Sequence, residues 1–229
     1  MNLDETYISL FGYTVFEPGT IVTNLVFFAL CLLYSLKLVK FRHQYARQMS
    51  FFILFMGVSS LFGAVAHGVH KQLGESFFNG VFFVMNALSL FAIYYCFRAP
   101  YTYHKLDSER PRLYVNIAMT WVLALLVFSF IKGDFLIIKI HAAISLIYSF
   151  GVHYIAYRKR NEQGSKLIIL GIGISFLSII VHSAHFSIHA WFNYKDLAHI
   201  IMIVSLIMIY QGIRQNLEVI DEELSEQKA

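Results

Sequence analysis

Histidine is the residue of this chain best suited to chemistry at neutral pH, and seven of the ten lie near one end of long apolar segments. Imidazole nitrogen binds Zn²⁺, and it also exchanges protons near pH 7. Ionisable side chains are costly inside a bilayer and mark functional sites where they occur. The seven that form the candidate site are His67, His70, His141, His182, His185, His189 and His199.

The spacing of these histidines indicates a metal centre. In the stretch from His182 through His185 to His189, steps of three and four residues put three rings on one stripe of a helix. A catalytic zinc ion takes three protein ligands and a water molecule. The predicted ligands are His67, His185, His189 and His199, with His182, His70 and His141 as further candidates.

Other polar residues near this layer could take part in hydrolysis. A zinc-bound water would attack a lipid carbonyl, with Asp196 as general base or as the group that orients a ligand. Ser60, two turns before His67, could donate a hydrogen bond to the developing oxyanion. Glu17 and Glu75 could each supply a carboxylate that orients a histidine.

The elements that position these residues are membrane helices. With 229 residues, 58% of them hydrophobic and 14% charged, the chain is too apolar for a soluble domain of its length. Apolar runs of about 20 residues each cover the ~30 Å of a hydrocarbon core. They predict seven spans in a single all-α domain, 1–229, at 20–41, 50–71, 76–97, 113–131, 135–157, 167–190 and 195–213. The flanks are a segment at 1–19 and a tail at 214–229.

Loop charges predict the orientation of this bundle. Of the 18 Lys and Arg residues, 14 fall on one side of the predicted spans and four on the other. The positive-inside rule then puts the N-terminus outside and the C-terminus in the cytoplasm, in the plasma membrane or a bacterial inner membrane. The same residues account for the pI of about 9.0, so no nucleic-acid partner is predicted. Cys31 and Cys96 lie in spans, and no disulfide is expected.

Three other interpretations of the histidines stay open at this stage, and so does the question whether the chain is an enzyme at all. The rings could be interface anchors, ligands of haem b or of a di-iron centre, or parts of a metal or proton carrier or sensor. His43, His104 and His153 fall in or beside the basic loops and are not expected in the site.

Seven spans, with His67 near the end of span 2 and His199 near the start of span 7, resemble a superfamily of membrane hydrolases. It includes alkaline ceramidases, adiponectin-type receptors and haemolysin-III-like proteins. The resemblance implies a zinc-dependent hydrolase of lipid amides or esters, with ligands from span 2 and from an HxxxH pair opening span 7. Here Lys195 stands at the first position of that pair, and Gly63 stands where the family has a serine before the span 2 histidine. The intact HxxxH is His185 to His189, at the end of span 6.

Overall fold

The computed structural model describes residues 6–69, 72, 74–103, 111–132 and 136–226. Seven helices and one β-hairpin account for most of them. The strands are β1 (Tyr7–Leu10) and β2 (Tyr13–Phe16). The helices are α1 (Pro18–Leu38), α2 (Gln44–Val69), α3 (Gly74–Tyr103), α4 (Pro111–Lys132), α5 (Leu136–Arg160), α6 (Gln163–Ala184) and α7 (Tyr194–Glu226).

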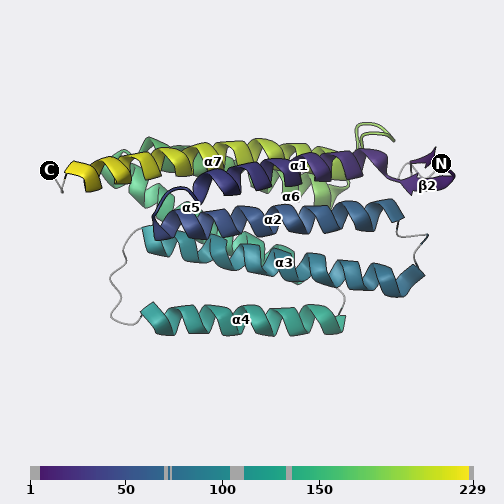
Figure 1. The fold of residues 1–229 in the computed structure, drawn as a ribbon, viewed down its shortest axis with the longest axis horizontal. Coiled ribbons are helices and arrows are strands. Elements are labelled where there is room, and N and C mark those ends of the chain that lie inside the picture. Colours follow the sequence, from purple (N-terminus) through teal and green to yellow (C-terminus); the bar gives the residue numbers. More distant parts are fainter. Residues whose placement is uncertain (1–5, 70–71, 73, 104–110, 133–135, 227–229) are drawn as a thin grey trace.

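Six of the helices form a closed ring, and α4 lies outside it. Going round the ring, α1 packs on α2, α2 on α3, α3 on α5, α5 on α6, α6 on α7, and α7 returns to α1. Figure 1 shows the long helices side by side, with α4 against the α3 side of the bundle. The largest apolar core joins α1, α2, α3, α6 and α7, where Phe27, Ile53 and Leu206 are almost fully buried.

Six helices, all except α4, are long and apolar enough to cross a membrane. Within the described part of α4, the apolar run is the shorter stretch Met119–Phe128. An all-α bundle with such helices agrees with a multi-pass membrane protein. Several boundaries differ from the expected ones. Helix α2 begins at Gln44, six residues before the predicted start, and α6 begins four residues early at Gln163. Helix α3 continues to Tyr103 with Pro100 inside it, α6 ends six residues early, and α7 continues through most of the 214–229 tail.

The early end of α6 separates histidines that were expected on one stripe. His185 adopts the left-handed backbone conformation, with φ of 51°, and the amide of Phe186 returns to the carbonyl of Val181. A left-handed residue just past the last turn is a common helix stop. The chain beyond it forms a short turn in which His189 and Phe192 pair through their backbones. The prediction of one helix through His189 is therefore wrong.

The 1–19 segment contains a β-hairpin that the apolar pattern did not predict. Tyr7 pairs with Phe16 and Leu10 with Tyr13, and the two residues between the strands both have positive φ. Such a two-residue turn matches the twist of paired strands. The hairpin packs on α2 and leads directly into α1, so that it marks one end of the bundle. We call this the hairpin end.

Helices α6 and α7 approach closely because glycines line their contact. A Cβ atom added at Gly212 would lie 2.4 Å from the carbonyl oxygen of Gly164, and one added at Gly164 would lie 2.5 Å from that of Gly212. Small residues allow the backbones of membrane helices to pack closely. Because backbone cannot yield as a flexible side chain does, these positions admit no side chain without separating the helices.

We expect Gly212→Ala to destabilise the bundle by about 1 to 3 kcal/mol, the usual cost of overpacking. The matched control is Gly173→Ala on α6, where an added Cβ meets no atom within 4 Å. Thermal unfolding in detergent should therefore show a lower midpoint for Gly212→Ala and an unchanged one for Gly173→Ala. Equal midpoints would contradict the close contact between α6 and α7.

Candidate functional site

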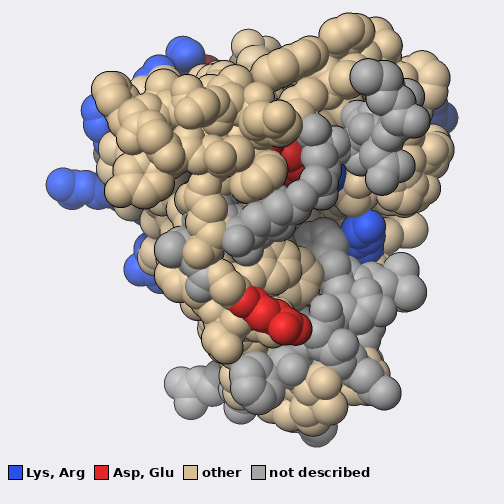
Figure 2. Space-filling model, turned by 90° about the vertical axis from the view of Figure 1, so that its right-hand side faces the viewer, with Lys and Arg blue, Asp and Glu red and all other residues tan. Residues whose placement is uncertain are grey.

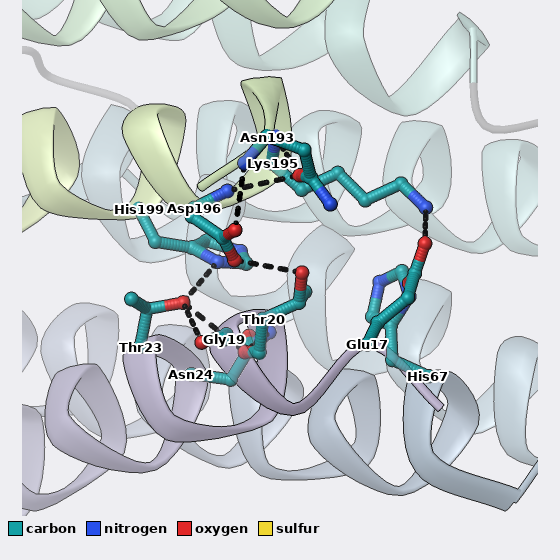
Figure 3. A network of polar contacts seen from close by, with 10 residues as sticks. All are labelled: Glu17, Gly19, Thr20, Thr23, Asn24, His67, Asn193, Lys195, Asp196 and His199. Carbon is teal, nitrogen blue, oxygen red and sulfur yellow. Dashed lines mark hydrogen bonds and ion pairs between the residues drawn. The ribbon is translucent and has the colours of Figure 1, made fainter. Parts of the chain in front are cut away.

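A buried carboxylate joins three helices at the hairpin end. Glu17, 4% exposed, is the residue before α1, and its two oxygens contact the Nδ1 of His67 on α2 and the Nζ of Lys195 on α7 (Figure 3). Pro18 occupies the first turn of α1, where its missing N–H is not needed. The sequence expectation that Glu17 orients a histidine is confirmed by this contact, whereas Glu75 is exposed.

The surroundings of Glu17 keep it ionised. Burial alone would raise the pKa of its carboxyl, but hydrogen bonds and charge from His67 and Lys195 outweigh burial and lower the pKa to about 2. A buried charge without partners would be strongly destabilising. The Glu17 carboxylate therefore fixes His67 and Lys195 in place.

Asp196 caps α7 and fastens it to α1. The side-chain oxygen of Asn193 accepts the amide of Lys195 at 2.8 Å, and the Asp196 carboxylate accepts the amide of Asn193 at 2.9 Å. This reciprocal pattern is a capping box. The other carboxylate oxygen accepts the hydroxyl of Thr20 at 2.8 Å, and Asp196 is 2% exposed. A Cβ at Gly19 would lie 3.0 Å from that carboxylate, so glycine permits this approach.

The hydrogen bonds of His199 are compatible with a tautomer that donates from Nδ1. Its Nδ1 lies 3.0 Å from the hydroxyl of Thr23, and that hydroxyl also lies 3.1 Å from the carbonyls of Gly19 and Thr20. A hydroxyl has one proton, and a carbonyl only accepts. When the Thr23 proton goes to either carbonyl, His199 donates from Nδ1 and keeps a lone pair on Nε2.

The same reasoning gives opposite roles to His67 and His182. The ionised Glu17 only accepts, so His67 donates from Nδ1. The Nδ1 of His182 lies 3.5 Å from the ammonium of Lys139, which only donates. His182 therefore accepts at Nδ1 and carries its proton on Nε2.

These side chains form one electrostatic group. His67, His182 and Lys195 are all close enough to His199 to interact with it electrostatically. When their rings are neutral and donate from Nδ1, His67 and His199 offer nitrogen lone pairs, whereas His182 and Lys195 offer protons. The arrangement can hold a cation or accept a proton on one side and stabilise developing negative charge on the other.

The other predicted ligands make different contacts. His185 and His189 are exposed. The ring of His185 packs edge-on against Tyr194, which also contacts His182, and His185 interacts electrostatically with His182. The Nδ1 of His189 accepts the amide of Trp191. His141 lies on α5, and His70 is outside the described residues. Within the described ranges, no three His, Cys, Asp or Glu side chains are grouped closely enough to hold a metal ion.

Ser60 ties α2 to α1. Its hydroxyl donates to the side-chain oxygen of Asn24 at 2.6 Å, and the amide of Asn24 donates to the carbonyl of Thr20 at 2.9 Å. The single hydroxyl proton is therefore engaged within the bundle, away from the rings. The structure gives Ser60 a role in packing that its position two turns before His67 did not indicate.

The residues that orient the rings were not predicted from the sequence. Thr20 and Thr23 lie in the first turns of an apolar helix, where threonine is common. Lys195 was noted as a departure from the HxxxH pattern, but its ion pair with Glu17 joins residues 178 positions apart. Only the uncommon pairing of an acidic residue before span 1 with a lysine opening span 7 could have indicated it.

Glu17 should make stability depend on pH. Because folding lowers its pKa from 4.5 to about 2, its contacts stabilise the fold fully above pH 4.5, and this contribution disappears as the pH falls toward 2. At about 1.4 kcal/mol per pKa unit, the loss is about 3 kcal/mol. The unfolding midpoint should therefore drop more between pH 6 and pH 3 in the unsubstituted chain than in Glu17→Gln. Glu75→Gln removes an exposed carboxylate at the same end and should behave like the unsubstituted chain.

Most of the chain matches one protein family. No curated protein and no solved structure matches the chain. Residues 19–218 match a family described as a family of unknown function, DUF6962. The match runs from the first turn of α1 into the last part of α7 and includes His67, Lys195 and His199. The chain therefore belongs to the family DUF6962.

Proposed function

We propose that the chain is a zinc-dependent membrane hydrolase that cleaves an ester or amide bond of a lipid, with His67 and His199 as metal ligands. One observation carries the proposal: the Nδ1 of each ring lies against a fixed oxygen, that of Glu17 for His67 and that of Thr23 for His199, so that donation from Nδ1 would place the lone pair of a neutral ring on Nε2. Histidines that bind metals usually donate their other nitrogen in this way, which fixes the tautomer.

The donor set suits a metal by the chemistry of its two imidazole nitrogens. Imidazole suits zinc, and it also suits iron and copper. His182 is not in the ligand set of this proposal, because its Nδ1 accepts from Lys139 and its Nε2 carries a proton. His185 and His189 are likewise left out, since both are exposed beyond the end of α6.

The other side chains of the site also have roles in this proposal. When bound, zinc polarises a carbonyl and lowers the pKa of a water ligand. His182 and Lys195 donate hydrogen bonds to the carbonyl oxygen as negative charge develops on it. Glu17 holds His67 and Lys195 in position, and Asp196 fixes the first turn of α7, on which His199 is carried.

A membrane lipid is the proposed substrate because the side chains lie at one end of apolar helices. In this proposal all seven helices cross the membrane, with the hairpin end outside. Support comes from the basic residues, which gather at the opposite end of the bundle. Those in described helix ends there include Lys37, Arg47, Arg98, Arg158, Lys159, Arg160 and Lys166. Figure 2 looks onto the hairpin end, where most of the described surface is neither acidic nor basic.

A second candidate is acid–base catalysis without a metal. It is favoured by Lys195, whose ammonium lies beside His67 and within electrostatic reach of His199. A fixed positive charge repels a metal cation at short range. In this candidate His199 accepts the proton of the attacking water, and Lys195 stabilises the oxyanion.

Metal analysis of the protein purified without chelator tests the first candidate. We expect about one zinc per chain, lost in His67→Ala and in His199→Ala, because each removes one of the two nitrogen ligands. His189→Ala is the matched control and should retain the metal, since this ring lies in the exposed turn after α6.

The outcomes separate the alternatives. Loss of zinc in His189→Ala but not in His199→Ala would show that His199 is not a ligand and would point to the exposed turn after α6 as the metal site. Hydrolysis of a fluorogenic lipid ester without bound metal, abolished by Lys195→Met, would favour acid–base catalysis. A strong visible absorption band in place of zinc would indicate haem.

A further inference from the structure

The inward face of α5 is polar, which is unusual for a membrane helix. Where the side chains of α5 are described, its buried residues are Ile138, Ser145, Ser149, His153 and Ala156. Three of the five are polar, and this span is the least apolar of the six. Polar residues at membrane depth tend to line pathways for ions or protons.

These polar residues recur every fourth position along the helix. The series begins with the half-buried His141 and continues through Ser145 and Ser149 to His153, which is fully buried. Four residues rise 6 Å along a helix, which is about the length of two hydrogen bonds through one water. From His141 to His153 the series covers about 18 Å, more than half of a hydrocarbon core.

Two groups in the series have unused hydrogen-bonding capacity. The Oγ of Ser145 and the Nε2 of His141 are buried, and neither has a partner among the described residues. A serine in a helix commonly bonds to the carbonyl four residues back. Ser145, 1% exposed, does not do so. Buried polar atoms of this kind are the usual binding places of internal water.

The series connects to the end of the bundle opposite the hairpin. The Nδ1 of His153 lies 3.1 Å from the hydroxyl of Ser165 on α6, which donates to the carboxylate of Glu162 at 2.8 Å. Glu162 also accepts from Tyr103 and pairs with Arg160, whose side chain is 54% exposed. Protonatable groups thus continue from the interior of the bundle to its surface.

From this continuity we infer that the chain conducts protons along α5, between His141 near the hairpin end and Glu162 at the opposite end. Water molecules in each of the three steps, from His141 to Ser145, from Ser145 to Ser149 and from Ser149 to His153, complete the hydrogen-bonded chain. A proton taken up at one end is balanced by one released at the other, and no group is oxidised or reduced. The inference does not rest on the proposed hydrolase, because His67 and His199 have no part in it.

Proton flux into vesicles tests the inference. The purified chain is reconstituted in phosphatidylcholine and phosphatidylglycerol vesicles that contain a pH-sensitive dye, and a potassium gradient with valinomycin drives proton entry. We expect faster acidification than in protein-free vesicles. Ser145→Val should reduce the rate to that of protein-free vesicles, whereas Ser145→Thr, of the same shape but with a hydroxyl, should keep it.

A second control separates conduction from packing. Ser205 is also buried in a membrane helix, but its hydroxyl donates to the carbonyl of Gly171 at 2.7 Å. Ser205→Val should therefore keep the flux, provided that it elutes as a single species from size-exclusion chromatography. Equal flux in Ser145→Val and Ser145→Thr would overturn the inference, as would a rate in the unsubstituted chain no higher than in protein-free vesicles.

Discussion

The hairpin end is organised around the requirement that a charge removed from water must be paired. Glu17 lies in the turn that leads into α1, and its carboxylate contacts α2 and α7 together. A buried carboxylate without partners is strongly unfavourable. The donor role of the His67 Nδ1, the position of Lys195 and the close approach of α1 to α7 all follow from satisfying this one group. The carboxylate of Asp196, the residue after Lys195, is also buried and is likewise paired, with the hydroxyl of Thr20 and the amide of Asn193.

The lengths of the apolar runs predicted the helices well. A membrane helix must hydrogen-bond its own backbone groups, and its side chains are mostly apolar along the whole segment. The ends of the helices were harder to predict. Helix α6 stops where His185 turns left-handed, a conformation that is more typical of glycine or asparagine. The hairpin turn likewise has Phe11 at positive φ, so the common Asn-Gly or Asp-Gly signal is missing. In both places the residue present has a positive φ, a conformation that this residue type seldom adopts.

The sequence indicated at what depth the residues of the candidate site lie, but not which of them face one another. The depth of a residue along a helix follows from sequence, which brought His67 and His199 to the same level. The direction of a side chain round the helix follows from packing, and the ring order of α1, α2, α3, α5, α6 and α7 is set by contacts between distant segments. For the same reason His153 was left out as a loop residue, although it is fully buried against α6.

The position of the partners along the chain has a consequence for biogenesis. Membrane helices enter the bilayer in order as the ribosome makes them, and Glu17 meets His67 after 50 residues but Lys195 only after 178. The hydrogen bond between Thr20 and Asp196 forms similarly late, since 176 positions separate these two residues. A chain that has been made only as far as α6 therefore carries a carboxylate whose lysine partner has not been made. Synthesis of α7 completes the contacts of α1, so that a product truncated before α7 differs from a longer one by a carboxylate without its ammonium partner.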